Sequence, residues 1–111
     1  MSHPLIFALA AMLATPVLAQ QPAPFAAFDG ASEAFLSDPH DLTLGPDGRL
    51  YVADKLAGRV AILDPETLAL VGEFGGGALA GVRDVSFTPD GLAVVAATGL
   101  GQVLVFDLGQ D

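Results

Sequence analysis

The sequence contains one pattern twice, and the second copy begins 43 residues after the first. Residues 41–64 align without a gap on residues 84–107, and nine of the 24 paired positions hold the same residue. Most other pairs exchange one apolar residue for another. A repeat of about 40–45 residues with several short strands is typical of β-propeller blades. The repeat therefore predicts an all-β chain made of two similar antiparallel sheets.

Alternating apolar residues and the turns between them predict the strands. In the first copy the strands are expected at residues 42–44, 50–54, 59–64 and 68–74. In the second copy they are expected at residues 84–87, 92–97 and 102–107. A further strand at residues 25–28 would complete the second sheet, because this run resembles residues 71–74. The expected fold is two four-stranded antiparallel β-propeller blades, which form a partial or oligomer-completed propeller.

The N-terminal segment has the pattern of a signal peptide for export. Residues 5–13 are almost wholly apolar, and Val17 and Ala19 supply the small residues that precede a signal-peptide cleavage site. The n-region has no Lys or Arg, so an uncleaved membrane anchor is the alternative. The apolar run is shorter than the ~20 residues that span a bilayer, which disfavours the anchor. We expect a signal peptide at residues 1–19, a lead-in at 20–38, and blades at 39–82 and 83–111, in a periplasmic or secreted protein.

The composition excludes several classes of partner and chemistry. The 13 Asp and Glu residues against four Lys and Arg give a formal net charge of −9. Nucleic acids and anionic membranes need clustered basic residues, so neither is an expected partner. The sequence has no cysteine, which excludes disulfides, thiolate metal sites and a cysteine nucleophile.

Two stretches of the repeat carry a family resemblance. Residues 39–54, with the sequence Pro-His-Asp-Leu-Thr-Leu-Gly-Pro-Asp-Gly-Arg-Leu-Tyr-Val-Ala-Asp, resemble the start of an NHL-repeat propeller blade. Residues 58–71 are similar to the related YVTN repeats of bacterial surface and periplasmic proteins. The resemblance implies a propeller fold. Its families include scaffolds, ligand-binding domains, lactonases and an amidating lyase, so the fold does not name the function.

Two blades pose a physical problem for a folded chain. Repeat units of this kind need about three copies for stability, and propellers typically close with four to eight blades. Two blades would leave apolar faces larger than the few hundred Å² that monomers usually expose. We therefore expect either a cyclic head-to-tail assembly, in which three chains would give six blades, or the remaining blades of a longer propeller. A two-blade monomer is a third alternative.

The candidate site residues lie at the start of the first strand of each copy. His40, Asp41, Arg83 and Asp84 would lie at the mouth of a propeller channel, where ligands bind. One interpretation is a ring of alternating charge that binds a small polar ligand or a metal. The other, favoured for Asp41 and Asp84, is that each carboxylate accepts backbone N–H bonds from a neighbouring loop and holds the blades in register.

No metal or other cofactor is expected. His40 is the candidate ligand for a divalent metal at the channel, but a lone histidine is a poor site without carboxylates in reach. The resemblance to the amidating lyase would imply zinc on several histidines, which this sequence does not supply. The resemblance to the lactonases would imply a divalent cation bound by Glu, Asn and Asp side chains at the channel. The sequence contains no Asn, and Glu33, Glu66 and Glu73 fall away from the channel strands.

Several other residues are expected to serve turns. These are Pro46, Asp47 and Gly48 in the first copy and Pro89, Asp90 and Gly91 in the second. Asp64 and Asp107 are expected to cap the turns that follow them. Asp54 and Arg59 flank another turn, and an exposed pair there would contribute ~0–1 kcal/mol.

These observations favour an exported, non-catalytic β-propeller repeat protein that binds another protein or a small molecule. The alternative is a part of a lyase- or lactonase-like propeller enzyme that is active only with further blades. The sequence leans away from an enzyme but leaves the question open.

Overall fold

The computed structural model describes residues 26–109. The expected signal peptide at residues 1–19 lies outside this range. All strands of the described residues lie within residues 39–106. The elements are β1 (Pro39–Leu44), β2 (Leu50–Asp54), β3 (Arg59–Leu63), β4 (Leu70–Phe74), β5 (Val82–Phe87), β6 (Ala93–Ala97), the short 3-10 helix η1 (Thr98–Leu100) and β7 (Gln102–Phe106).

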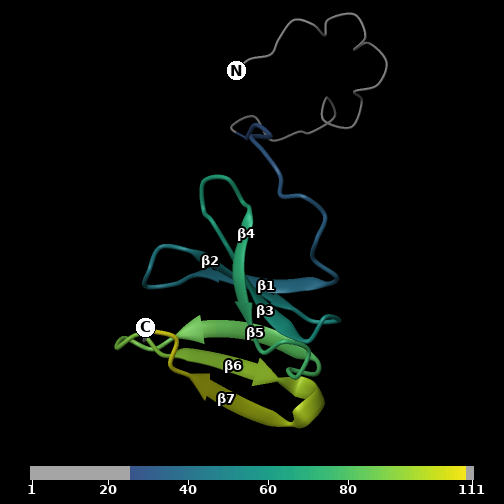
Figure 1. The fold of residues 1–111 in the computed structure, drawn as a ribbon, viewed down its shortest axis with the longest axis vertical. Coiled ribbons are helices and arrows are strands. Elements are labelled where there is room, and N and C mark those ends of the chain that lie inside the picture. Colours follow the sequence, from purple (N-terminus) through teal and green to yellow (C-terminus); the bar gives the residue numbers. More distant parts are fainter. Residues whose placement is uncertain (1–25, 110–111) are drawn as a thin grey trace, which may run out of the picture. The chain divides into compact units, whose positions relative to one another are not determined.

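The seven strands form two antiparallel sheets. The first has the order β1-β2-β3-β4 and the second has the order β5-β6-β7, so within each sheet consecutive strands are neighbours. Figure 1 shows β1 of the first sheet beside β5 of the second. The prediction of an all-β chain with two similar sheets is confirmed. Within residues 26–109, no helix has the length and apolar character needed to cross a membrane.

The two sheets repeat the same strand register. Leu42 pairs with Val52 in the first sheet, and their counterparts 43 residues later, Val85 and Val95, pair in the second. The other pairs of the first three strands correspond in the same way. Each first strand also carries a bulge at the same place, before the aspartate of the repeat. The sequence repeat is thus a structural repeat, down to this irregularity.

The loops repeat as well. The Lys55 N–H donates to the Asp38 carbonyl at 2.9 Å, and 43 residues later the Thr98 N–H donates to the Gly81 carbonyl at 3.3 Å. These bonds fasten the chain that enters each sheet to the turn after its second strand. These backbone bonds form although the side chains at the two places differ. The two copies therefore share a backbone geometry that does not depend on the identity of these side chains.

The fourth strand of the first sheet begins later than the sequence pattern predicted. Asp64 caps the preceding turn, as expected, by accepting the N–H bonds of Glu66 and Thr67 on Oδ1 at 2.8 and 2.9 Å. Leu68 then takes a left-handed conformation with φ 63°, and the Asp64 N–H donates to the Ala69 carbonyl. The turn therefore extends through Ala69, and β4 starts at Leu70 instead of Leu68.

The second sheet has three strands, not the four of the expected fold class. Residues 26–28 form no strand, and Phe25 lies outside the described residues. Two adjacent alanines followed by Asp29 and Gly30 have low β-propensity and little apolar surface to stabilise a strand.

The main core lies between the two sheets. The face of the first sheet that meets the second is called its front face and consists of Tyr51, Ala53, Val60, Ile62 and Phe74. The opposing back face of the second sheet consists of Val82, Val85, Phe87, Val95, Leu104 and Phe106. Tyr51 and Phe87 meet edge to face, with ring centroids 4.8 Å apart. Leu79, from the loop between the sheets, fills the same core.

The two remaining faces are exposed to different degrees. The back face of the first sheet consists of Leu42, Leu44, Leu50, Val52, Ala61 and Leu63. Phe35 and Leu36 of the lead-in pack on part of it, while Leu42 and Leu44 stay 59% and 62% exposed. The front face of the second sheet consists of Asp84, Ser86, Val94, Ala96, Val103 and Val105.

The single tyrosine provides a test of the core. Burial raises the pKa of Tyr51 to about 12, and the hydroxyl donates to Oδ2 of Asp47 at 2.8 Å. We expect the phenol to ionise near this value in the folded chain and near pH 10 in the unfolded chain. Because the folded pKa is the higher one, the associated stability is present below about pH 10 and is lost as pH rises to about 12. Ultraviolet titration of phenolate absorbance measures this, and an ordinary pKa would contradict the buried position.

Candidate functional site

The candidate channel residues lie on the adjacent strands β1 and β5. The structure brings Asp41 and Asp84 close together, and the Asp41 carboxylate on β1 reaches the backbone of β5 in the other sheet. The Val85 N–H donates to Oδ2 of Asp41 at 3.3 Å. This bond joins the first strand of one sheet to the first strand of the other, so the donor is a strand residue and not the neighbouring loop that the register interpretation of Asp41 expected.

The two carboxyl groups influence each other's protonation. The hydrogen bond between the side chains of Asp41 and Asp84 lowers the pKa of Asp41 and raises the pKa of Asp84. Burial opposes the shift of Asp41, while the amide of Val85 supports it. Two neighbouring carboxylates repel when both are ionised, so the pKa of one group falls while that of the other rises.

The raised pKa of Asp84 leads to a prediction for D84N. Stability that depends on a raised pKa is present in acid and is lost as pH rises through the folded value. Asparagine keeps a donor for Asp41 at every pH, so D84N should be more stable than the natural chain at neutral pH by about 0.5 kcal/mol. The free energies of unfolding of D84N and the natural chain should converge as pH falls through the raised pKa of Asp84, because the protonated carboxyl then also donates to Asp41. Urea unfolding across this range measures the difference, and a less stable D84N at neutral pH would contradict the account.

His40 and Arg83 are both exposed on the same two strands. The charge of His40 makes a small contribution to the lowered pKa of Asp41, after those of the Asp84 hydrogen bond and the Val85 and Leu42 amides. Among residues 26–109, no group of three or more His, Asp or Glu side chains is arranged to hold a metal ion. The site as described is therefore an acid pair flanked by two basic residues.

The Pro-Asp-Gly segments form the same turn in both sheets. Gly48 and Gly91 have φ values of 83° and 93°, a conformation that glycine adopts without strain. Asp47 accepts the Arg49 N–H on Oδ1 at 3.1 Å. Asp90 accepts the hydroxyl of Thr88. Their side chains act within the turns, and that of Asp47 also reaches the Tyr51 hydroxyl.

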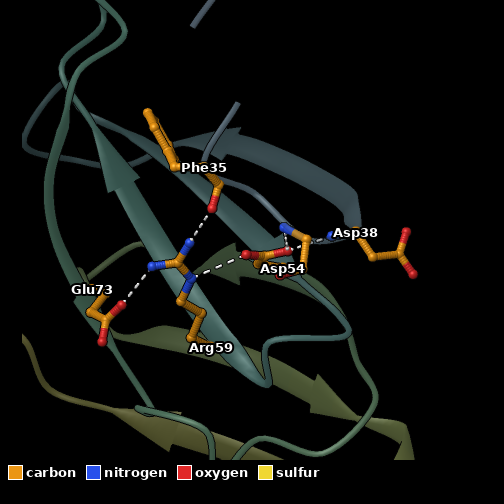
Figure 2. A network of polar contacts seen from close by, with 6 residues as sticks. Phe35, Asp38, Asp54, Arg59 and Glu73 are labelled. Carbon is orange, nitrogen blue, oxygen red and sulfur yellow. Dashed lines mark hydrogen bonds and ion pairs between the residues drawn. The ribbon is translucent and has the colours of Figure 1, made fainter. Parts of the chain in front are cut away.

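A buried polar network lies on the first sheet at the opposite end from these turns. Asp54 is fully buried and pairs with Arg59 at 3.0 Å, and the two side chains are 0% and 15% exposed. The guanidinium also donates to Glu73 at 2.7 Å and to the Phe35 carbonyl at 2.9 Å. Figure 2 shows Arg59 at the centre, reaching β4 on one side and the lead-in on the other.

The same network fastens the lead-in to the sheet. The backbone amides of Ser37 and Asp38 donate to Oδ1 of Asp54 at 2.8 and 2.7 Å. Burial alone would raise the pKa of Asp54, but these two amides and Arg59 outweigh it and lower the pKa. The expected pairing of Asp54 with Arg59 is confirmed, and the pair is buried, so the small contribution expected of an exposed pair does not apply.

Sequence reasoning missed the partners of this pair but contained a signal for them. At these positions the second copy has Ala97 and Gln102 in place of Asp54 and Arg59. A buried acid and base that appear together in one copy and disappear together in the other indicate a contact that only the first copy needs. That contact is with the lead-in, which precedes the first sheet alone.

Repeated antiparallel sheets packed face to face define the general class of the protein, a β-sheet repeat protein. Residues 36–63 match the family model of the NHL repeat, which spans β1 to β3 and the end of the lead-in. The chain therefore carries an NHL-type repeat, as the resemblance implied. Searches of curated proteins and of solved structures returned no significant match.

Proposed function

We propose that the chain is an exported, non-catalytic protein-interaction module of the β-propeller type. The NHL repeat suggests an interaction module of this type. The observation that carries the proposal is the contrast between two valines at the same place in the repeat. Val60 on the first front face is 0% exposed, whereas Val103 on the second front face is 67% exposed. A position that is core in one copy is open surface in the other.

The second front face has the chemistry of a binding surface. Val94, Ala96, Val103 and Val105 lie on two paired strands and form one apolar stripe. Contiguous apolar surface on a folded protein marks interaction sites. Burying an exposed valine is worth about 1.5 kcal/mol, so a partner that covers this stripe gains several such contributions.

The engagement of Asp41 supports a non-catalytic role. Its carboxylate accepts a backbone N–H bond between the sheets, so the group serves the packing of the structure. The raised pKa of Asp84 follows from its neighbour Asp41, which provides a structural reason for the shift. Neither group needs a substrate to account for its state.

In-cell photo-crosslinking tests the binding proposal. A photoreactive amino acid is placed at Val103 in the full chain, and a second variant carries it at Leu56, a somewhat more exposed residue in the turn between β2 and β3. We expect a discrete adduct from position 103 whose partner is identified by mass spectrometry, and none from position 56. Equal labelling at both positions, or no adduct from either, would contradict the proposal.

Export is tested by the mass of the mature protein. Residues 1–19 carry the pattern that motivates the proposal. We expect the chain in the periplasmic fraction or the medium with a mass that lacks these residues. An intact chain that stays in the cytosolic fraction would contradict export and would leave the binding proposal standing.

A further inference from the structure

We propose that the front face of the second sheet binds the back face of the first sheet of another copy of this chain. The contact would repeat the front-to-back packing that joins the two sheets within one chain. This inference rests on the proposed function, because it names the partner of the same apolar stripe.

The structural repeat supplies the shape of the occupant. Inside the chain, the front face of the first sheet is covered by the back face of the second. The front face of the second sheet has the same strand register as the front face of the first. If the front face of the second sheet is covered by the same front-to-back packing, the surface that covers it must be the back face of a sheet of this repeat.

The chain itself carries a back face with exposed apolar residues. Leu42 and Leu44 are the counterparts of Val85 and Phe87, which pack in the core between the sheets. One chain thus presents both halves of the contact at once, an open front and an incompletely covered back. A contact between unlike faces is heterologous, and copies joined in this way form a ring if the rotation closes.

The polar contacts between the sheets also have counterparts on the open faces. Inside the chain the Val85 N–H donates to Asp41, and the corresponding contact would place Asp84 of one copy against the Leu42 N–H of the next. The Gly58 carbonyl accepts the Leu79 N–H at 2.9 Å. A shift of 43 residues turns this bond into one between Gly101 of one copy and Leu36 of the next.

The contact between copies is expected to be weaker than the contact within a chain. Tyr51 and Phe87 meet edge to face inside the chain, but their counterparts are Val94 and Leu44. The aromatic pair is therefore replaced by two smaller aliphatic side chains, which bury less surface. The net charge of −9 also makes copies repel, so added salt should strengthen association by screening that repulsion.

Single-cysteine variants test the register directly, because the natural chain has no cysteine. Separate preparations of V94C and L44C are mixed at moderate salt and treated with a short bis-maleimide. A specific contact raises the effective concentration of the two thiols, so we expect at least about tenfold more crosslinked dimer than from V94C mixed with L56C. A second pair, D84C with L42C, follows from the contact between Asp41 and Val85 and should behave in the same way.

Each outcome decides the inference. Crosslinking in both mixed pairs, with little in V94C alone, supports front-to-back binding. Efficient crosslinking of V94C to itself would show front-to-front binding, and yields no higher than the L56C control would show no binding of copies; either result overturns the inference. The Tyr51 titration verifies that each variant is folded. An adduct from Val103 to a different protein, with no thiol crosslink, would keep the proposed function and overturn only this inference.

Discussion

R59M should lower the free energy of unfolding by about 3 kcal/mol, because it leaves a buried carboxylate without its counterion. Asp54 is 0% exposed, and Arg59 is its ion-pair partner. A domain of this size is stable by roughly 4–12 kcal/mol in total, so the loss is a large share. In urea the unfolding midpoint should fall by about 2 M. Methionine keeps much of the apolar stem, which separates the lost charge from lost packing.

R49M is the matched control. Arg49 is exposed, and its replacement should change stability by no more than about 0.5 kcal/mol. The pH dependence adds a second check. The lowered pKa of Asp54 means that its contribution is present at neutral pH and is lost as pH falls through the folded value. The difference in free energy of unfolding between R59M and the natural chain should therefore become smaller in acid. Equal losses of stability for R59M and R49M at neutral pH would contradict the buried network.

L79A should lower the free energy of unfolding by about 2–5 kcal/mol, because it opens a cavity in the core between the sheets. The side chain of Leu79 is 2% exposed and packs with residues of both sheets. Thermal or urea unfolding at low protein concentration, where copies of the chain are separate, measures the loss.

L36A is the matched variant in the other copy of the repeat, since Leu36 lies 43 residues before Leu79. Leu36 is only partly buried, on the back face of the first sheet. Its replacement by alanine should lower the free energy of unfolding by about 1 kcal/mol, because Leu36 buries less apolar surface than Leu79 does. A loss for L36A as large as that for L79A would show that the two back faces are equally covered, against the structure.

The repeat made most of the fold predictable from the sequence. The Gly-Pro-Asp-Gly turn and the alternation around Leu42 and Val52 placed β1 and β2 within a few residues, and the 43-residue shift carried them to β5 and β6. These features are local, because a turn and the apolar period of a strand depend on neighbouring residues. The pairing across the sheet then follows from short connections between consecutive strands.

The buried network was missed because it depends on contacts between distant residues. The Phe35 carbonyl and the Asp38 amide join the network of Asp54 and Arg59 only after residues 35–38 pack against the sheet. The left-handed Leu68 was missed for a different reason. It follows the local cap at Asp64, which was expected, but its conformation goes against the usual preference of leucine.

The candidate site was predictable as a set of residues but not as a geometry. The repeat placed Asp41 and Asp84 at corresponding points, and in the folded chain the two groups shift each other's pKa in opposite directions. Sequence reasoning treats the two copies as equivalent. They differ because Asp41 faces a neighbouring sheet that supplies the Val85 amide, while Asp84 lies on an open face.

Proton contacts measured by nuclear magnetic resonance test the central claim most directly, which is that one sheet unit occurs twice and packs front to back. We expect contacts between the ring protons of Tyr51, the only tyrosine, and those of Phe87, whose centroid lies 4.8 Å away. We also expect cross-strand contacts between Leu42 and Val52 to be matched by those between Val85 and Val95. Different registers in the two segments, or a Tyr51 ring with no phenylalanine neighbour, would contradict the account.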